Sequence, residues 1–61
     1  MSEFTEYDVY DIPWGYWVYQ YGYLIGAEDD SEGCLLTFHR GREQYNQWFS
    51  SGVILEATPA K

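Results

Sequence analysis

Residues 16–25 read YWVYQYGYLI, and Trp14 lies just before them. Together these positions hold two of the three Trp and four of the seven Tyr in the chain. Successive residues of a strand point to opposite faces, and here both faces would be aromatic or aliphatic. We therefore predict one long strand over residues 16–26, in which Gly22 marks a bulge, a bend or a close backbone approach. One face would pack on the core, and the other would meet a partner.

Alternating patterns on both sides of this stretch predict further strands. Residues 4–10 mix Val, Thr and Tyr with acidic residues, and Pro13 ends that strand. Residues 34–39 form a strand that places Cys34, Leu36 and Phe38 on one face, and residues 53–56 form a short last strand. Residues 27–33, AEDDSEG, predict an acidic loop, because Asp, Ser and Gly favour turns. The strands on either side of this loop should form an antiparallel hairpin.

Residues 42–51 have two interpretations. Tyr45, Trp48 and Phe49 at i, i+3 and i+4 form one helical face, and a glycine follows where a C-terminal cap belongs. The alternative is a second hairpin with its turn at residues 40–41, which gives an all-β small SH3-like barrel. That strand would mix polar and aromatic residues on both faces, so the helix is favoured. The predicted fold class is α+β, a small antiparallel sheet (β-β-β-α-β) with one helix packed on one face.

The 61 residues predict a single small domain, with residues 57–61 as a frayed tail. A chain this short buries only about 60% of its unfolded surface, so its core is marginal. Cys34 is the only cysteine and His39 the only histidine, so neither an intrachain disulfide nor a His/Cys zinc site can support that core. The large aromatic side chains must therefore stabilise it, each removing roughly 150–250 Å² from water.

Charge and spacing argue against several kinds of chemistry. Ten acidic and three basic residues give a net charge of -7, which disfavours direct nucleic-acid binding and favours a protein partner with a basic surface. Cys34 and His39 are five apart on one strand and should face opposite sides, so they are not expected to form a nucleophile and its base. Residues 28–33 resemble the start of a calcium loop, but its twelfth position is His39 instead of the ligating Glu. No metal, no other cofactor and no enzymatic activity are expected.

Two acidic groups and one aromatic set are the candidate partner-binding residues. Carboxylates two residues apart on a strand lie about 7 Å from each other, a spacing similar to that of successive phosphates. An acidic edge can therefore occupy the DNA-binding groove of another protein, although such charge can also serve only to keep an aromatic surface soluble. The candidates are the aromatic set Trp14, Tyr16, Val18 and Leu24, and the acidic residues Glu6, Asp8, Glu28, Asp29, Asp30 and Glu32.

The predicted function is a small acidic, non-enzymatic protein-binding module that masks a partner surface. Its sharpest form is a phage or mobile-element inhibitor of a host nucleic-acid-binding enzyme, acting as a DNA mimic. The alternative is a small accessory or structural subunit of a larger assembly, or a homodimer formed through the aromatic sheet. The first residues are acidic, unlike a signal peptide, and no apolar run reaches the ~18–20 residues that cross a membrane. A cytoplasmic location is expected, in the host cytoplasm if the protein is phage-encoded.

Overall fold

The structure is a computed structural model that describes residues 4–59. Every regular element in this range is a strand, so it contains no helix that could cross a membrane. The strands are Thr5–Asp8 (β1), Tyr16–Val18 (β2), Gly22–Asp30 (β3), Gly33–Arg40 (β4), Glu43–Ser50 (β5) and Ile54–Pro59 (β6). They form one antiparallel sheet in the order β1-β6-β2-β3-β4-β5.

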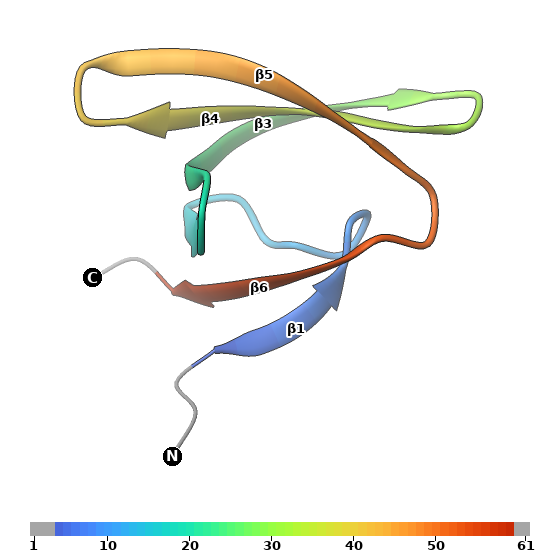
Figure 1. Ribbon diagram of the computed structural model, residues 1–61, viewed down its shortest axis with the longest axis horizontal. Coiled ribbons are helices and arrows are strands. Elements are labelled where there is room, and N and C mark those ends of the chain that lie inside the picture. The colour runs from blue at the N-terminus through green and yellow to red at the C-terminus, as the bar shows by residue number, and fades with distance from the viewer. Residues whose placement is uncertain (1–3, 60–61) are drawn as a thin grey trace.

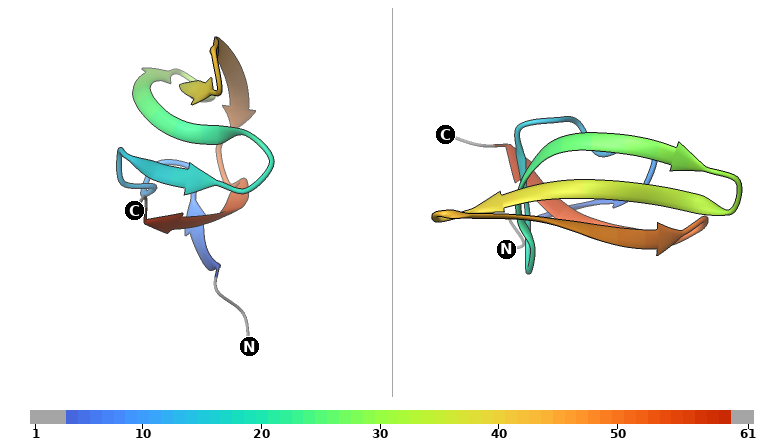
Figure 2. Two further views of the ribbon diagram at one scale, coloured as in Figure 1. Left: turned by 90° about the vertical axis from the view of Figure 1, so that its left-hand side faces the viewer. Right: turned by 90° about the horizontal axis from the view of Figure 1, so that it is seen from above.

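The sheet curls into a half-barrel (Figure 1). Strand β5 lies along one rim and β1 along the other, and residues 51–53 carry the chain between the two parts of the sheet. Figure 2 shows the long ribbon of β3, β4 and β5 passing over the smaller part made by β1, β2 and β6. Because β1 and β5 are the two ends of the strand order, the described sheet is open rather than closed.

The inner face of this curl holds the core. Strand β4 contributes Cys34, Leu36 and Phe38, each at most 2% exposed, which confirms the alternation predicted for this strand. The Phe38 ring lies 5.2 Å from that of Tyr21 and 5.9 Å from that of Tyr45, measured between ring centroids. The other buried side chains come from β2, β3, β5 and β6 and from the segment after β1: Val9, Ile12, Val18, Leu24, Phe49 and Ala57.

The predicted α+β fold class is wrong, because residues 42–51 form no helix. Most of them make up β5, which pairs with β4 without interruption from Arg40↔Glu43 to Gly33↔Ser50. Buried backbone groups need hydrogen-bond partners, and β5 supplies them along the whole of β4. The segment is therefore a strand of an all-β protein, and this pairing places it beside β4 in the sheet instead of packing it across one face.

The side chains of β5 explain why the helical pattern was misleading. Tyr45 and Phe49 face the core, as they would in a helix, because residues four apart lie on one side of a strand as well. Trp48 points to the other face and is 44% exposed. The turn before β5 consists of Gly41 and Arg42, with Gly41 at φ 63°. The hairpin considered as the alternative thus describes this segment, but it belongs to an open half-barrel.

The long strand predicted over residues 16–26 is also corrected, to β2 and β3 joined by a tight turn. The N–H of Tyr21 donates to the carbonyl of Val18 at 2.8 Å and closes this turn. Gly22 follows with φ 112°, a conformation that glycine adopts far more readily than other residues. A Cβ at this position would lie 2.8 Å from the carbonyl oxygen of His39. Gly22 therefore both bends the chain and lets β3 approach β4, which are two of the roles that the sequence suggests.

The acidic segment and the C-terminal segment are more ordered than the sequence predicts. Strand β3 continues to Asp30, so only residues 31–32 form the turn of the β3–β4 hairpin. The hairpin itself is confirmed. Residues 57–59, expected in the frayed tail, belong to β6, where Ala57 is fully buried between Thr5 and Val18. Residues 60 and 61 lie outside the described residues.

Gly33 is the position at which an added methyl group should be tolerated least. A Cβ there would lie 2.6 Å from Cζ2 of Trp48 and would also overlap the carbonyl oxygen of Phe49. We predict that Gly33→Ala lowers the free energy of unfolding by about 1–3 kcal/mol, as overpacking does. The measurement is urea-induced unfolding.

The matched control is Gly26→Ala, whose Cβ would meet Thr37 at 3.7 Å, an ordinary van der Waals distance. Its free energy of unfolding should change by no more than about 0.5 kcal/mol. Equal losses in the two variants would contradict the close approach of Trp48 to Gly33. The control matters because any Gly→Ala change also reduces the entropy of the unfolded chain.

Candidate functional site

The most distinctive surface of the described residues lies on the outer face, at the turn end of the β3–β4 hairpin. The register places Glu28 opposite Leu35, and Leu35 opposite Trp48, so these side chains form a row across three strands. Asp30 lies two residues further along β3 and therefore on the same face. We call these four residues the Trp48 shelf: Glu28, Asp30, Leu35 and Trp48.

Asp30 holds the Trp48 ring in place. The indole Nε1 donates to Oδ2 of this carboxylate at 3.2 Å, and the other oxygen, Oδ1, accepts the N–H of Ser31 at 2.6 Å. Gly33 pairs with Asp30 in the ladder, and its missing side chain leaves the space that the indole ring occupies. The ring is nevertheless 44% exposed. The shelf therefore presents a fixed aromatic surface to solvent.

The surroundings of the shelf are acidic. Glu28, Asp29 and Asp30 line a shallow hollow of about 370 Å³ together with Leu35 and Trp48. The two described arginines lie at and just after the far end of β4, whose last residue is about 23 Å along the strand from its first. One of them is Arg40, whose Nη1 donates to the carbonyl of Gln20 at 2.8 Å. Within residues 4–59, the hollow thus has negative charge without a cation beside it.

The four hairpin carboxylates that the sequence singled out are close together in the structure. Glu28 and Asp30 belong to the shelf, and Asp29 lies between them and lines the same hollow. Glu32 occupies the turn, where its carbonyl accepts the N–H of Ser51 at 3.0 Å and its side chain is exposed. This hydrogen bond ties the acidic turn to the end of β5.

The second predicted acidic group, Glu6 and Asp8, lies on the opposite edge strand. Oδ1 of Asp8 accepts the N–H of Tyr10 at 3.0 Å, so this carboxylate shapes the turn after β1. Glu6 is exposed and stands directly opposite Glu56 in the β1–β6 ladder. Desolvation raises the pKa of Tyr10, and Asp29, Asp8 and Asp30 each raise it further, so Asp8 shares a neighbour with the hairpin carboxylates, whereas Glu6 lines another hollow.

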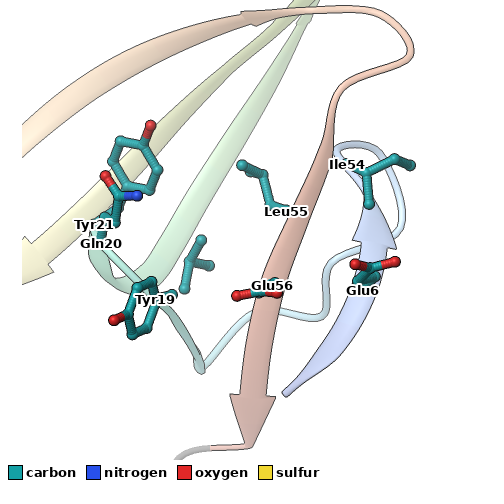
Figure 3. A pocket seen from close by; sticks show the side chains of 8 residues that line it. Glu6, Tyr19, Gln20, Tyr21, Ile54, Leu55 and Glu56 are labelled. Atoms are coloured by element: carbon teal, nitrogen blue, oxygen red, sulfur yellow. The ribbon is translucent and has the colours of Figure 1, made fainter. Parts of the chain in front are cut away.

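Glu6 and Glu56 lie on the wall of a second hollow, which measures about 400 Å³ (Figure 3). Residues 19–21, the turn between β2 and β3, face Leu55 and Glu56 across it. Like charges directly opposite each other in a sheet are mildly destabilising. The hollow therefore favours a cationic group over an anionic one, but no aromatic ring is fixed in it by a carboxylate as Trp48 is on the shelf.

The fold places the residues of the predicted aromatic set in different environments, some exposed and some buried. Trp14 is 65% exposed in the bend before β2. Tyr16 is half-buried, with its ring edge-on to a tyrosine ring of β1 at 5.8 Å. Val18 and Leu24 are each 1% exposed, so they belong to the core and not to a partner surface. The reason is the turn at residues 19–21, which folds β2 against β3 so that Val18 and Leu24 both lie on the inner face.

The sequence prediction misses Trp48 and Leu35 as site residues. The helical interpretation places Trp48 in the core. The signal that identifies it is the strand alternation of Gln44, Asn46 and Trp48, in which the tryptophan shares a face with two amides and is therefore expected at the surface. Leu35 is recognisable only through its cross-strand neighbours, which the sequence does not reveal.

Cys34 and His39, the only cysteine and histidine, do not meet in the structure. Cys34 is buried on the inner face, whereas His39 is exposed near the other end of the same strand. Burial raises the pKa of the Cys34 thiol, and the Asp29 carboxylate raises it further. No group of three or more His, Cys, Asp or Glu residues between positions 4 and 59 is placed to hold a metal ion.

Comparisons with protein-family models, with curated proteins and with solved structures found no match to this chain. The Trp48 shelf is accordingly assigned from its contacts, its exposure and its charge.

The raised pKa of Cys34 predicts a specific pH dependence of stability. The thiol contributes stability below its ordinary pKa of 9.0, and this contribution is lost as the pH rises towards the pKa of the folded state. We predict that the melting temperature of the wild-type chain falls more steeply than that of Cys34→Ala between about pH 8.5 and 10.5. Both proteins keep Tyr7, whose pKa is also raised. Desolvation raises the pKa of Tyr10 and Cys34 raises it further, so the difference reports Cys34 together with its effect on Tyr10. Parallel pH profiles would show that folding does not perturb this thiol.

Proposed function

We propose that this chain is a small, non-enzymatic binding module that masks a basic surface of a partner protein through the Trp48 shelf. The observation that carries the proposal is the hydrogen bond between the Trp48 indole and the Asp30 carboxylate. It fixes a half-exposed tryptophan in an acidic setting, so that an apolar contact and charged contacts are available at one place.

Each part of the shelf has a role in binding. Tryptophan is among the residues enriched at the energetic centres of protein interfaces, and a ring already held in one orientation loses little conformational freedom on binding. Leu35 adds apolar area beside it. The carboxylates of Glu28 and Asp30 attract a basic partner and speed its encounter more than they add affinity. The partner that fits best has an apolar or aromatic patch bordered by Lys or Arg.

The distribution of charge supports the same conclusion. The described arginines lie at and just after the end of β4 that is far from the shelf, and the Arg40 guanidinium already donates to a backbone carbonyl. The hairpin therefore has an acidic end and a basic end. A basic protein would be oriented by this asymmetry before contact, because charged surfaces steer association over roughly 10 Å at moderate salt.

The finer form of the proposal is an inhibitor that acts as a DNA mimic on a nucleic-acid-binding enzyme. Glu28 and Asp30 are spaced about 7 Å apart along β3, a repeat similar to that of phosphates on one nucleic-acid strand. In this form the carboxylates replace phosphates, and Trp48 occupies a position that a base or sugar would fill. Competition by nucleic acid for the partner distinguishes this form from simple masking.

A second candidate function is an accessory or structural subunit. The open edges of the half-barrel favour it, since strand edges are common sites of attachment between chains. A subunit would bind its partner through backbone groups and apolar area, and its complex would therefore survive high salt. The masking module would release its partner as salt screens the carboxylates.

Capture from a bacterial lysate tests the proposal. The immobilised wild-type chain is compared with a variant that carries Glu28→Gln, Asp29→Asn, Asp30→Asn and Glu32→Gln. We expect the wild-type chain to retain a specific protein at ~0.15 M salt and to release it near ~1 M. The amide variant should retain at least about tenfold less of it, because the partner's basic groups lose their counter-charges. A DNA duplex added in excess should displace the captured protein if the chain is a DNA mimic.

A matched control removes the same number of charges away from the hairpin, through Glu6→Gln, Asp11→Asn, Glu43→Gln and Glu56→Gln. Masking by the shelf predicts that this control still captures the protein, whereas a role in solubility alone predicts the same behaviour for both variants. Trp48→Ala keeps every charge and should also abolish capture. Recovery of no protein, or equal retention by the two amide variants, contradicts the proposed function.

A further inference from the structure

The two edges of the sheet differ in how well they are protected against further pairing. Strand β1 has four residues, and two of them are acidic. Strand β5 has eight residues, EQYNQWFS, with one charge at its first position and no proline. Strand β5 is the last in the strand order, so no other described strand pairs with its outer edge. An edge this long and this neutral presents a row of free N–H and C=O groups that other strands can pair with.

We propose that β5 pairs antiparallel with β5 of a second copy of this chain, so that the two half-barrels join in one continuous sheet. The proposal does not rest on the masking function, because it concerns backbone edge groups and residues of the β3–β4 and β4–β5 turns. A second copy is the occupant that the sequence of β5 fits, for reasons of register and of charge.

The register follows from the two faces of the strand. Opposite residues of an antiparallel pair lie on the same face, so core-facing residues of one copy must oppose core-facing residues of the other. With the two-fold axis at Gln47, Tyr45 lies opposite Phe49 of the second copy, and two pairs of aromatic rings extend the core. With the axis at Asn46, the carboxylate of Glu43 would lie opposite Phe49 instead. The first register is favoured because Phe49 is only 8% exposed and its neighbour should be apolar.

Charge at the ends of β5 fits the same arrangement. The basic turn with Arg42 precedes β5, and the acidic turn with Glu32 is tied to its other end by the hydrogen bond to Ser51. Antiparallel pairing brings the basic turn of each copy to the end of β5 to which the acidic turn of the other copy is bonded, once at each end of the dimer. These two contacts oppose the general repulsion between two chains that each carry a net charge of -7.

Sedimentation velocity of the purified chain, without any partner, tests the proposal. The interface is a single strand edge, smaller than that of most stable complexes, so a reversible dimer is expected over a range of roughly 10–500 µM. A chain that sediments as a monomer throughout this range would overturn the proposal. The outcome is independent of any masking activity, which requires a different protein.

Charge exchange tests the arrangement of the two copies. Arg42→Glu and Glu32→Arg each place like charges at both ends of the dimer and should each weaken association by about tenfold. A mixture of the two variants restores opposite charges at both ends, and should therefore dimerise as tightly as the wild-type chain. Circular dichroism of each variant checks that its fold is intact. Dimers that neither variant weakens, or that mixing does not restore, would contradict this orientation.

A lysine placed at the axis tests the register. Gln47→Lys would set two lysines directly opposite each other, and it should weaken association by about tenfold. Gln44→Lys makes the same change of charge but lies opposite Ser50, so its effect should be small. Both variants reduce the net negative charge, which by itself favours association. Loss of dimer in Gln47→Lys alone supports the register, and equal behaviour of the two variants overturns it.

Discussion

Burial of Phe38 in a group of aromatic rings is the interaction on which the other features of this protein depend. Phe38 is fully buried in the centre of β4, and its ring contacts Tyr21 from the turn after β2 and Tyr45 from β5. The turn after β2 is thereby packed against the β4–β5 hairpin at one point. A chain of 61 residues with one cysteine has no disulfide to replace this packing. Because a core so small is marginal, the aromatic rings supply much of the apolar area that keeps the sheet curled.

The orientation of Phe38 also determines the outer surface. Once Phe38 and Tyr45 point inward, the alternation of β4 and β5 turns Leu35 and Trp48 outward. Gly33 then allows the indole to reach Asp30, because any side chain at that position would occupy the space that the ring fills. The inward orientation of the core residues therefore sets which side chains of β4 and β5 form the Trp48 shelf, and the missing side chain of Gly33 leaves room for the indole. Its rigidity has the same origin, because β5 cannot shift by one residue without exposing Phe49.

The alternation of polar and apolar residues made part of the fold predictable, whereas the rest depends on which strands pair with each other. The inward face of β4 and the β3–β4 hairpin can be predicted from the sequence, because the alternation of β4 and the turn-forming residues before it fit only one kind of structure. Residues 42–51 have two, since Tyr45 and Phe49 share a face in either a helix or a strand, and only the pairing with β4 selects the strand. Positions 16–26 seemed to have more apolar residues than one core-facing strand can bury, because the prediction treated two strands as one. After the turn closed by Tyr21, Val18 and Leu24 both face the core, and the acidic candidates of the hairpin gain a tryptophan neighbour that no local pattern reveals.

The shelf and the edge of β5 use different parts of the same strand, and their geometry makes them compatible. Binding to the shelf engages side chains on the outer face, whereas pairing along the edge engages backbone groups in the plane of the sheet. In the register centred on Gln47, the two Trp48 backbone positions lie about 8 Å apart, from two residues along the strand and one strand spacing across it. The two shelves then lie on one continuous outer face, with each indole directed from β5 towards Gly33 and Asp30 of its own copy. A partner with a basic groove would meet twice the charge and twice the aromatic area on one continuous face, and the second contact would form at the high effective concentration that linkage provides.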